Sequence, residues 1–276
     1  GLYKKLVVAD GLGPFVDAVF AAPHAHGRWT LLQALCGYTV QIWADFSGYT
    51  DMGRGAARML GIRLPENFLS PYLSRTPSEF WRRWHISLSE WMRDYIYAPL
   101  ALSIGGGSVA QALSAVVVTM GLCGLWHGAQ WHFVLWGIYH GGLLVVEKQF
   151  KLRTPESDAA GWAAIRGLVS TLATLGLVMF GWLIFRAENF HALAAFIKGL
   201  VLDTGSAPAP DDAWVVPVAI AFCVLVQILG YYDLRKQRWA VDWPGLLEGW
   251  AKPEGRGRAL GFCLGGALAV LFVGAV

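Results

Sequence analysis

His127 is the residue whose surroundings most favour chemistry. It lies in the sequence GLWHGAQW (residues 124–131), midway through the 52 residues 95–146, which contain no Asp, Glu, Lys or Arg. An ionisable side chain at membrane depth is costly and usually has a function. A neutral imidazole lowers that cost and can act as a general base. Gly124 and Gly128 leave room beside it for a ligand. The residue types alone leave catalysis and packing against a neighbouring helix equally open for His127.

A second candidate, His85, lies in the sequence FWRRWHISLS (residues 80–89). The residues alone favour a histidine that contacts lipid headgroups at the membrane interface. Arg82 and Arg83 could bind anionic lipid or a phosphate-bearing donor, although solvated interface charge is the simpler interpretation. The same segment contains tryptophans that are typical of interface anchors: Trp81, Trp84 and Trp91.

Three further groups of residues have weaker claims to chemistry. Asp45 is a carboxylate at the edge of an apolar run, and we expect it to pair with an arginine of the next segment. Cys123 precedes His127 by four residues, but an isolated apolar cysteine is typical of a core. His132 and His140 follow without an acidic neighbour or a ligand spacing typical of zinc. We therefore predict no metal site.

The composition restricts the class of protein that must position these residues. Of the 276 residues, 55% are hydrophobic and 15% are charged, whereas soluble domains carry about 25% charged residues. The mean hydropathy of +0.45 excludes a disordered chain and disfavours a soluble enzyme. Four dispersed cysteines exclude a disulfide scaffold, and a net charge of +3 is too small to indicate nucleic-acid binding. The composition predicts an all-α, polytopic membrane helical bundle.

Apolar runs locate the expected membrane spans. They are residues 29–50, two arms within 109–146, and residues 167–185, 213–232 and 259–276. Basic residues flank 109–146 on both sides, so we expect a hairpin whose two ends lie in the cytoplasm. Residues 51–108 form an arginine-rich, interfacial or cytoplasmic segment, in which the spacing of aromatic residues predicts one amphipathic helix from Ser78 to Trp91.

The remaining expectations concern the ends of the chain. Residues 1–28 are expected to be an amphipathic lead-in or a connecting loop, interrupted at Pro14, Pro23 and Gly27. The sequence begins with Gly1 and not with Met, and we expect no signal peptide in it. We therefore expect residues 1–276 to be a single transmembrane domain from the C-terminal part of a longer protein.

Several motifs occur together and in a characteristic order. They are QIWADFSGYTDM (41–52), LPENF (64–68), WRRWHISLS (81–89), RDYIY (93–97), GLWHGA (124–129) and FRA (185–187). In this combination the sequence resembles the membrane-bound O-acyltransferase family, and within it the bacterial branch typified by alginate O-acetyltransferase. The resemblance covers residues 1–146 well and the remainder loosely. It implies a multi-span helical bundle with a catalytic histidine, His127, deep in the membrane. It also implies that His85 is a second site histidine, against the interpretation from the residues alone.

The resemblance further implies acyl transfer to an exported polysaccharide such as alginate. An acyl thioester, with acetyl-CoA as the expected donor, would arrive from the cytoplasm and an acceptor hydroxyl from the other side. His127 would remove the hydroxyl proton, while His85 orients, polarises or relays. Arg82 and Arg83 would hold the CoA phosphates.

The expected setting completes this hypothesis. Trp126 and Asp45 are also expected at the substrate site, and no cofactor is expected beyond the donor itself. The expected partners are membrane lipid, the exopolysaccharide and periplasmic acetylation proteins, with no nucleic acid. The expected location is the bacterial inner membrane, crossed several times. Two alternatives remain: a transporter or channel with His127 in a proton or substrate pathway, and a structural scaffold of an export complex.

Overall fold

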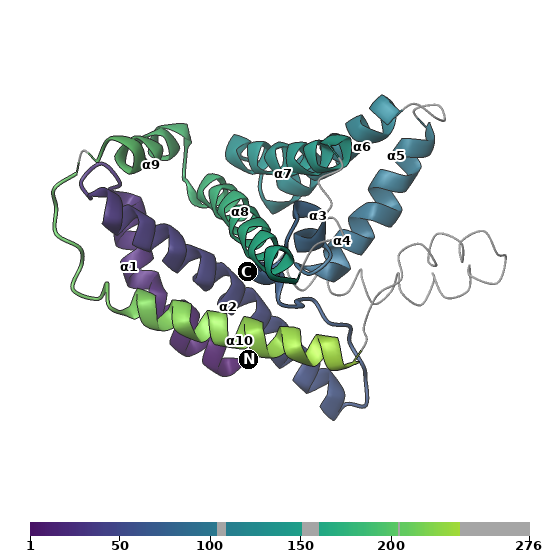
Figure 1. The fold of residues 1–276 in the computed structure, drawn as a ribbon, viewed down its shortest axis with the longest axis horizontal. Helices are drawn as coiled ribbons and strands as arrows, with labels where there is room; N and C mark the ends of the chain where they lie inside the picture. Colours follow the sequence, from purple (N-terminus) through teal and green to yellow (C-terminus); the bar gives the residue numbers. More distant parts are fainter. Residues whose placement is uncertain (104–108, 151–159, 204, 238–276) are drawn as a thin grey trace.

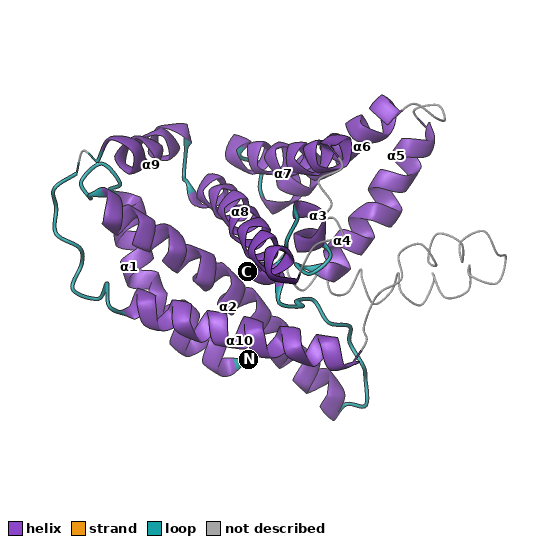
Figure 2. Cartoon of the chain, in the orientation of Figure 1, coloured by secondary structure: helices purple, strands orange, loops and turns teal. Residues whose placement is uncertain are grey.

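Helices and loops account for residues 1–103, 109–150, 160–203 and 205–237, which are the residues described by the computed structural model (Figure 1). This part of the chain contains no strand, so the predicted all-α class is confirmed (Figure 2). In chain order, the elements are η1 (Tyr3–Ala9), α1 (Asp10–Ala21), α2 (Arg28–Met59), η2 (Pro71–Leu73), α3 (Pro77–Trp81), α4 (Ile86–Met92), η3 (Arg93–Tyr97), α5 (Ala98–Ser103), α6 (Val109–His127), α7 (Trp131–Phe150), α8 (Ala160–Arg186), α9 (Phe190–Leu202) and α10 (Val215–Gln237).

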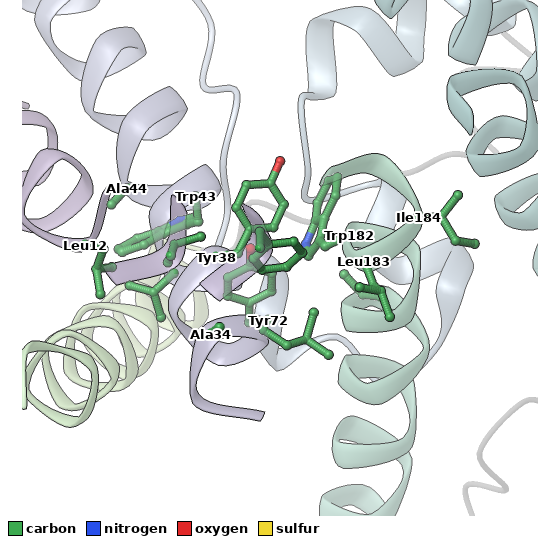
Figure 3. Packing of buried hydrophobic residues seen from close by; sticks show 14 of the residues in the cluster. Leu12, Ala34, Tyr38, Trp43, Ala44, Tyr72, Trp182, Leu183 and Ile184 are labelled. Carbon is green, nitrogen blue, oxygen red and sulfur yellow. The ribbon is translucent and has the colours of Figure 1, made fainter. Parts of the chain in front are cut away.

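The long helix α2 organises one side of the fold, where it packs against α1, α8, α9 and α10. Its Tyr38 and Trp43 belong to a buried cluster that also contains Tyr72 of η2 and Trp182 of α8 (Figure 3). The Tyr72 hydroxyl donates a 2.6 Å hydrogen bond to the Thr39 carbonyl. This bond fixes the segment that leads into α3 against the centre of the fold.

Three helices within the described residues are long and apolar enough to cross a membrane. They contain the segments Ala110–His127, Ala164–Arg186 and Val215–Tyr232. They coincide with the predicted spans at 167–185 and 213–232 and with the first arm of 109–146. The predicted span at 29–50 lies inside α2, which is less apolar than these three because it carries several polar side chains. The predicted span at 259–276 lies outside the described residues.

A tight helical hairpin joins α6 to α7, as the apolar arms predict. Glycines allow the two backbones to meet: a Cβ at Gly124 would collide with the Phe133 carbonyl, and a Cβ at Gly137 with the Met120 carbonyl. Helices in a lipid bilayer gain no hydrophobic energy by associating, so small residues stabilise their packing by letting the two backbones approach closely. The turn at Gly128 is equally tight, because a Cβ there would lie 2.6 Å from the ring of Phe133.

Two sequence predictions in this part of the chain are wrong. Pro14 does not interrupt the lead-in but lies inside α1, which follows η1 directly. The amphipathic helix predicted from Ser78 to Trp91 is instead divided into α3 and α4, with His85 between them in the left-handed region at φ 43°. Tertiary contacts outweigh the helical spacing at this point, because the backbone around His85 bonds to residues 67–69 instead of continuing the helix.

Candidate active site

His127 is the last residue of α6, and four aromatic rings surround it. Its ring centroid lies 5.3 Å from that of Trp136, 5.2 Å from Phe185, 4.9 Å from Trp126 and 6.5 Å from Phe133. The contacts with Trp136 and Phe185 are edge-to-face, a favourable geometry for aromatic pairs. These rings come from α6, α7 and α8. The imidazole is therefore held by three helices, and apolar groups face it.

His85 is held by its own backbone and by one ring. Its positive φ of 43° is strained for a non-glycine residue, although histidine tolerates this region better than most. Asn67 binds the two backbone N–H groups that follow His85: its carbonyl accepts from the Ile86 N–H at 3.2 Å, and its side-chain oxygen accepts from the Ser87 N–H at 3.0 Å. The ring of Phe46 in α2 then packs against the imidazole at 4.6 Å.

The His85 imidazole lies in the protein interior. His85 is only 7% exposed, and burial lowers its pKa to about 3, with a further contribution from the nearby charge of His127. His85 is therefore neutral at physiological pH. Its Nδ1 atom has no hydrogen-bond partner among the described residues. The structure corrects the interpretation of His85 as an exposed headgroup contact, because its ring lies in the protein interior.

An aromatic cluster fills the space between the elements that carry these histidines. Trp81 and Trp84, expected as interface anchors, are instead buried within it. Trp84 lies 4.9 Å from Trp182, and Trp81 lies 5.8 Å from Trp136, which contacts His127. The helical spacing of Trp81 and Trp84 showed that they share a face but could not show what covers it. That cover is α7 and α8, which come later in the chain.

The remaining predicted site residues lie in different surroundings. Arg83 forms a 2.6 Å ion pair with Glu79, whereas Arg82 is exposed. The sequence predicted that Asp45 would pair with an arginine of the following segment. The structure corrects this prediction, because Asp45 pairs at 2.7 Å with Lys5 of η1. Trp126 is 37% exposed and packs on His127. Of these residues, only Trp126 makes a ring contact with either histidine.

Sequence reasoning assigned no role to three residues that shape the site: Asn67, Phe46 and Trp136. Asn67 and Phe46 lie inside the quoted motifs 64–68 and 41–52, which was the available signal. Cys123 is buried in α6, as a core cysteine should be. Within the described residues, no three His, Cys, Asp or Glu side chains converge in a way that could hold a metal ion.

Comparison with known proteins places this geometry in a family. The model of the "MBOAT, membrane-bound O-acyltransferase family" matches residues 17–186. The probable alginate O-acetylase AlgI of Azotobacter vinelandii is 48% identical over 193 residues, which cover 68% of this chain and 36% of that protein. Its counterpart in Pseudomonas putida is 42% identical over 242 residues, covering 85% and 47%. The peptidoglycan O-acetyltransferase of Helicobacter pylori is 34% identical over 203 residues, covering 73% and 37%.

The matched family segment contains both histidines and most of the aromatic cluster around them. It begins in α1 and ends with α8, so it also includes the hairpin that carries His127. The chain spans less than half the length of each of these relatives. The family match and the sequence identity to these relatives together show that the chain belongs to the membrane-bound O-acyltransferase family.

Proposed function

We propose that the whole protein transfers an acetyl group from a cytoplasmic thioester to hydroxyl groups of an exported polysaccharide. The observation that carries this proposal is that one aromatic cluster holds both the buried His85 and the partly buried His127 in a chain of this family. Relatives named for acetylation of alginate and of peptidoglycan support a polysaccharide as the final acceptor. Acetyl-CoA is the proposed donor, and alginate is the proposed polymer.

His127 acts as the general base in this proposal. As the acceptor oxygen attacks the thioester carbonyl, the hydroxyl proton passes to the imidazole. The carbon–sulfur bond then breaks, and the departing thiolate takes the proton from His127 to leave as a thiol. The rings of Trp136 and Phe185 keep water from competing with the acceptor. Trp126, which is part-exposed beside His127, lines the approach to the reacting atoms.

His85 supports this reaction as a neutral imidazole. Its strained backbone and the two Asn67 hydrogen bonds hold the ring in one place, as is typical of functional positions. Its lowered pKa keeps the ring uncharged at neutral pH, so it can donate a hydrogen bond to the thioester or relay a proton. Arg82, which is exposed, is better placed than the paired Arg83 to meet the phosphates of the donor.

The cell location follows from the same proposal. The protein would cross the bacterial inner membrane several times, with the arginine-rich segment 51–108 in the cytoplasm. The donor would reach the site from that side. Periplasmic proteins of the acetylation machinery and membrane lipid would be its partners.

The decisive experiment uses the full-length protein in lipid vesicles with radiolabelled acetyl-CoA and the polysaccharide. His127→Ala should lower the transfer rate by at least about 100-fold, the range that a general base contributes. His191→Ala, which removes an exposed histidine of α9, is the matched control and should transfer like the parent. Equal transfer by His127→Ala would refute the general-base role.

The same assay separates transfer from transport. A parent protein that never consumes acetyl-CoA, yet moves protons across the vesicle membrane, would favour the channel or transporter alternative. His85→Ala should lower transfer while its abundance in the membrane stays near that of the parent. A loss of abundance in proportion to the loss of activity would assign His85 a purely structural role.

A further inference from the structure

A third histidine, His140, lies deeper in the protein than either of the two proposed site histidines. It is 1% exposed, on the face of α7 turned toward α8, and its Nε2 atom has no hydrogen-bond partner among the described residues. Burying a polar atom without a partner costs about 1–3 kcal/mol. An aliphatic side chain would avoid that cost, so the presence of an imidazole here requires an explanation.

The imidazole fits into a notch that a glycine creates in α8. A Cβ at Gly181 would collide with Nε2 of His140 and lie 3.2 Å from its Cε1 atom. Next to it in the chain, the Tyr139 hydroxyl donates a 2.9 Å hydrogen bond to the Leu177 carbonyl, one turn before Gly181. Two consecutive residues of α7 therefore fix its register against α8.

The His140 ring contacts tryptophans from both parts of the proposed active site, the part that carries His127 and the part that carries His85. The Trp136 ring contacts both imidazoles, with its centroid 5.1 Å from that of His140 and 5.3 Å from that of His127. Trp81 meets His140 edge-on at 5.2 Å, and α3, which ends at Trp81, leads within four residues to His85. Any displacement of His140 is therefore transmitted both to the hairpin that carries His127 and to the loop that carries His85.

We propose that His140 is a positioning residue that, seated in the Gly181 notch, sets the placement of His127 relative to His85. It touches neither of the reacting groups, and it acts through Trp136 and Trp81. This inference rests on the proposed function, since it concerns the geometry of that same site. It assigns a role to a buried group that the acyl-transfer mechanism leaves unused.

Kinetics of the full-length protein in vesicles test this role. A misplacement of about 1 Å can cost about 100-fold in rate, so His140→Ala should lower kcat by about that factor. KM for acetyl-CoA should change by no more than about twofold, because donor binding is not altered. The matched control is Val16→Ala, which truncates a buried side chain of α1 that lies against Gly37 of α2. It should reduce abundance but keep kcat per molecule near that of the parent.

A double-mutant cycle tests the notch itself. Gly181→Ala alone should also lower kcat, because the new methyl group displaces the His140 ring. In the double variant His140→Ala/Gly181→Ala the methyl group has room, so kcat should be no lower than in His140→Ala alone. If the kcat losses of the two single variants simply multiply in the double variant, the proposed notch is wrong. An unchanged kcat in His140→Ala would overturn the positioning role.

A spectroscopic measurement separates this inference from the proposed function. In protein labelled with 5-fluorotryptophan, the resonances of Trp136 and Trp81 are assigned with the variants Trp136→Phe and Trp81→Phe. His140→Ala should shift both resonances, whereas Val16→Ala should shift neither. This result holds even if the parent consumes no acetyl-CoA, in which case the proposed function alone fails. Unmoved resonances in His140→Ala would refute the positioning role whatever the activity.

Discussion

The close crossing of α6 and α7 makes Gly137 one of the two glycines of the hairpin that tolerate a side chain least, together with Gly124. Gly137→Ala places a methyl group against the Met120 carbonyl oxygen, 2.8 Å from its carbonyl carbon and 3.1 Å from the Gly121 Cα. Carbon atoms make ordinary contacts at about 3.5–4.0 Å, so the two helices must separate by about 1 Å. Overpacking of this kind costs about 1–3 kcal/mol. Because Trp136 and its contact with His127 move with α7, the rate of the proposed acetyl transfer should fall about 100-fold.

The matched control is Gly142→Ala on the same helix, because nothing lies within 4 Å of a Cβ at that position. Alanine is favoured over glycine in a helix by about 1 kcal/mol, so this variant should be slightly more stable than the parent. Gly137→Ala gains the same helix propensity, so the two variants should differ in unfolding free energy by the overpacking cost alone, about 1–3 kcal/mol. Thermal unfolding of the full-length protein in one detergent gives the stability order, and vesicle assays give kcat. A Gly137→Ala variant with the kcat and unfolding temperature of the parent would refute the close crossing.

Three further predictions concern His85, Lys5 and Thr76. Since burial lowers the pKa of His85 to about 3, its contribution to stability should be complete above about pH 6.5, its ordinary value, and be lost as the pH falls toward 3. Unfolding temperatures across this range should show a shallower loss in His85→Asn, and identical curves would contradict the assignment. Lys5 forms exposed ion pairs with Asp45 and Asp10, and each should contribute less than about 1 kcal/mol, so Lys5→Ala should leave the unfolding temperature and transfer rate nearly unchanged. A large loss in that variant would show a role beyond the ion pairs. The Thr76 hydroxyl accepts from the Glu79 N–H at 3.2 Å and caps α3, so Thr76→Ala should cost about 1 kcal/mol in an unfolding measurement, whereas Thr76→Ser should cost little.

The sequence by itself determined the class of protein and the hairpin, and it indicated His127 as the first candidate histidine. Each of these follows from local composition, because a long run without formal charge has few environments other than a membrane or a core. The same run isolates His127, and the flanking basic residues indicate that its two arms form a hairpin. Motif order supplied the family and the second histidine.

Only the tertiary structure decided how His85, Trp84 and His140 are used. The spacing of residues 78–91 is helical, yet the Asn67 bonds break the helix and turn His85 into the interior. The rings that enclose Trp84 and His140 come from α7 and α8, far away in sequence. A residue pattern reports which side chains share a face of one element. It cannot report what covers that face, because burial depends on contacts between segments that are distant in the chain.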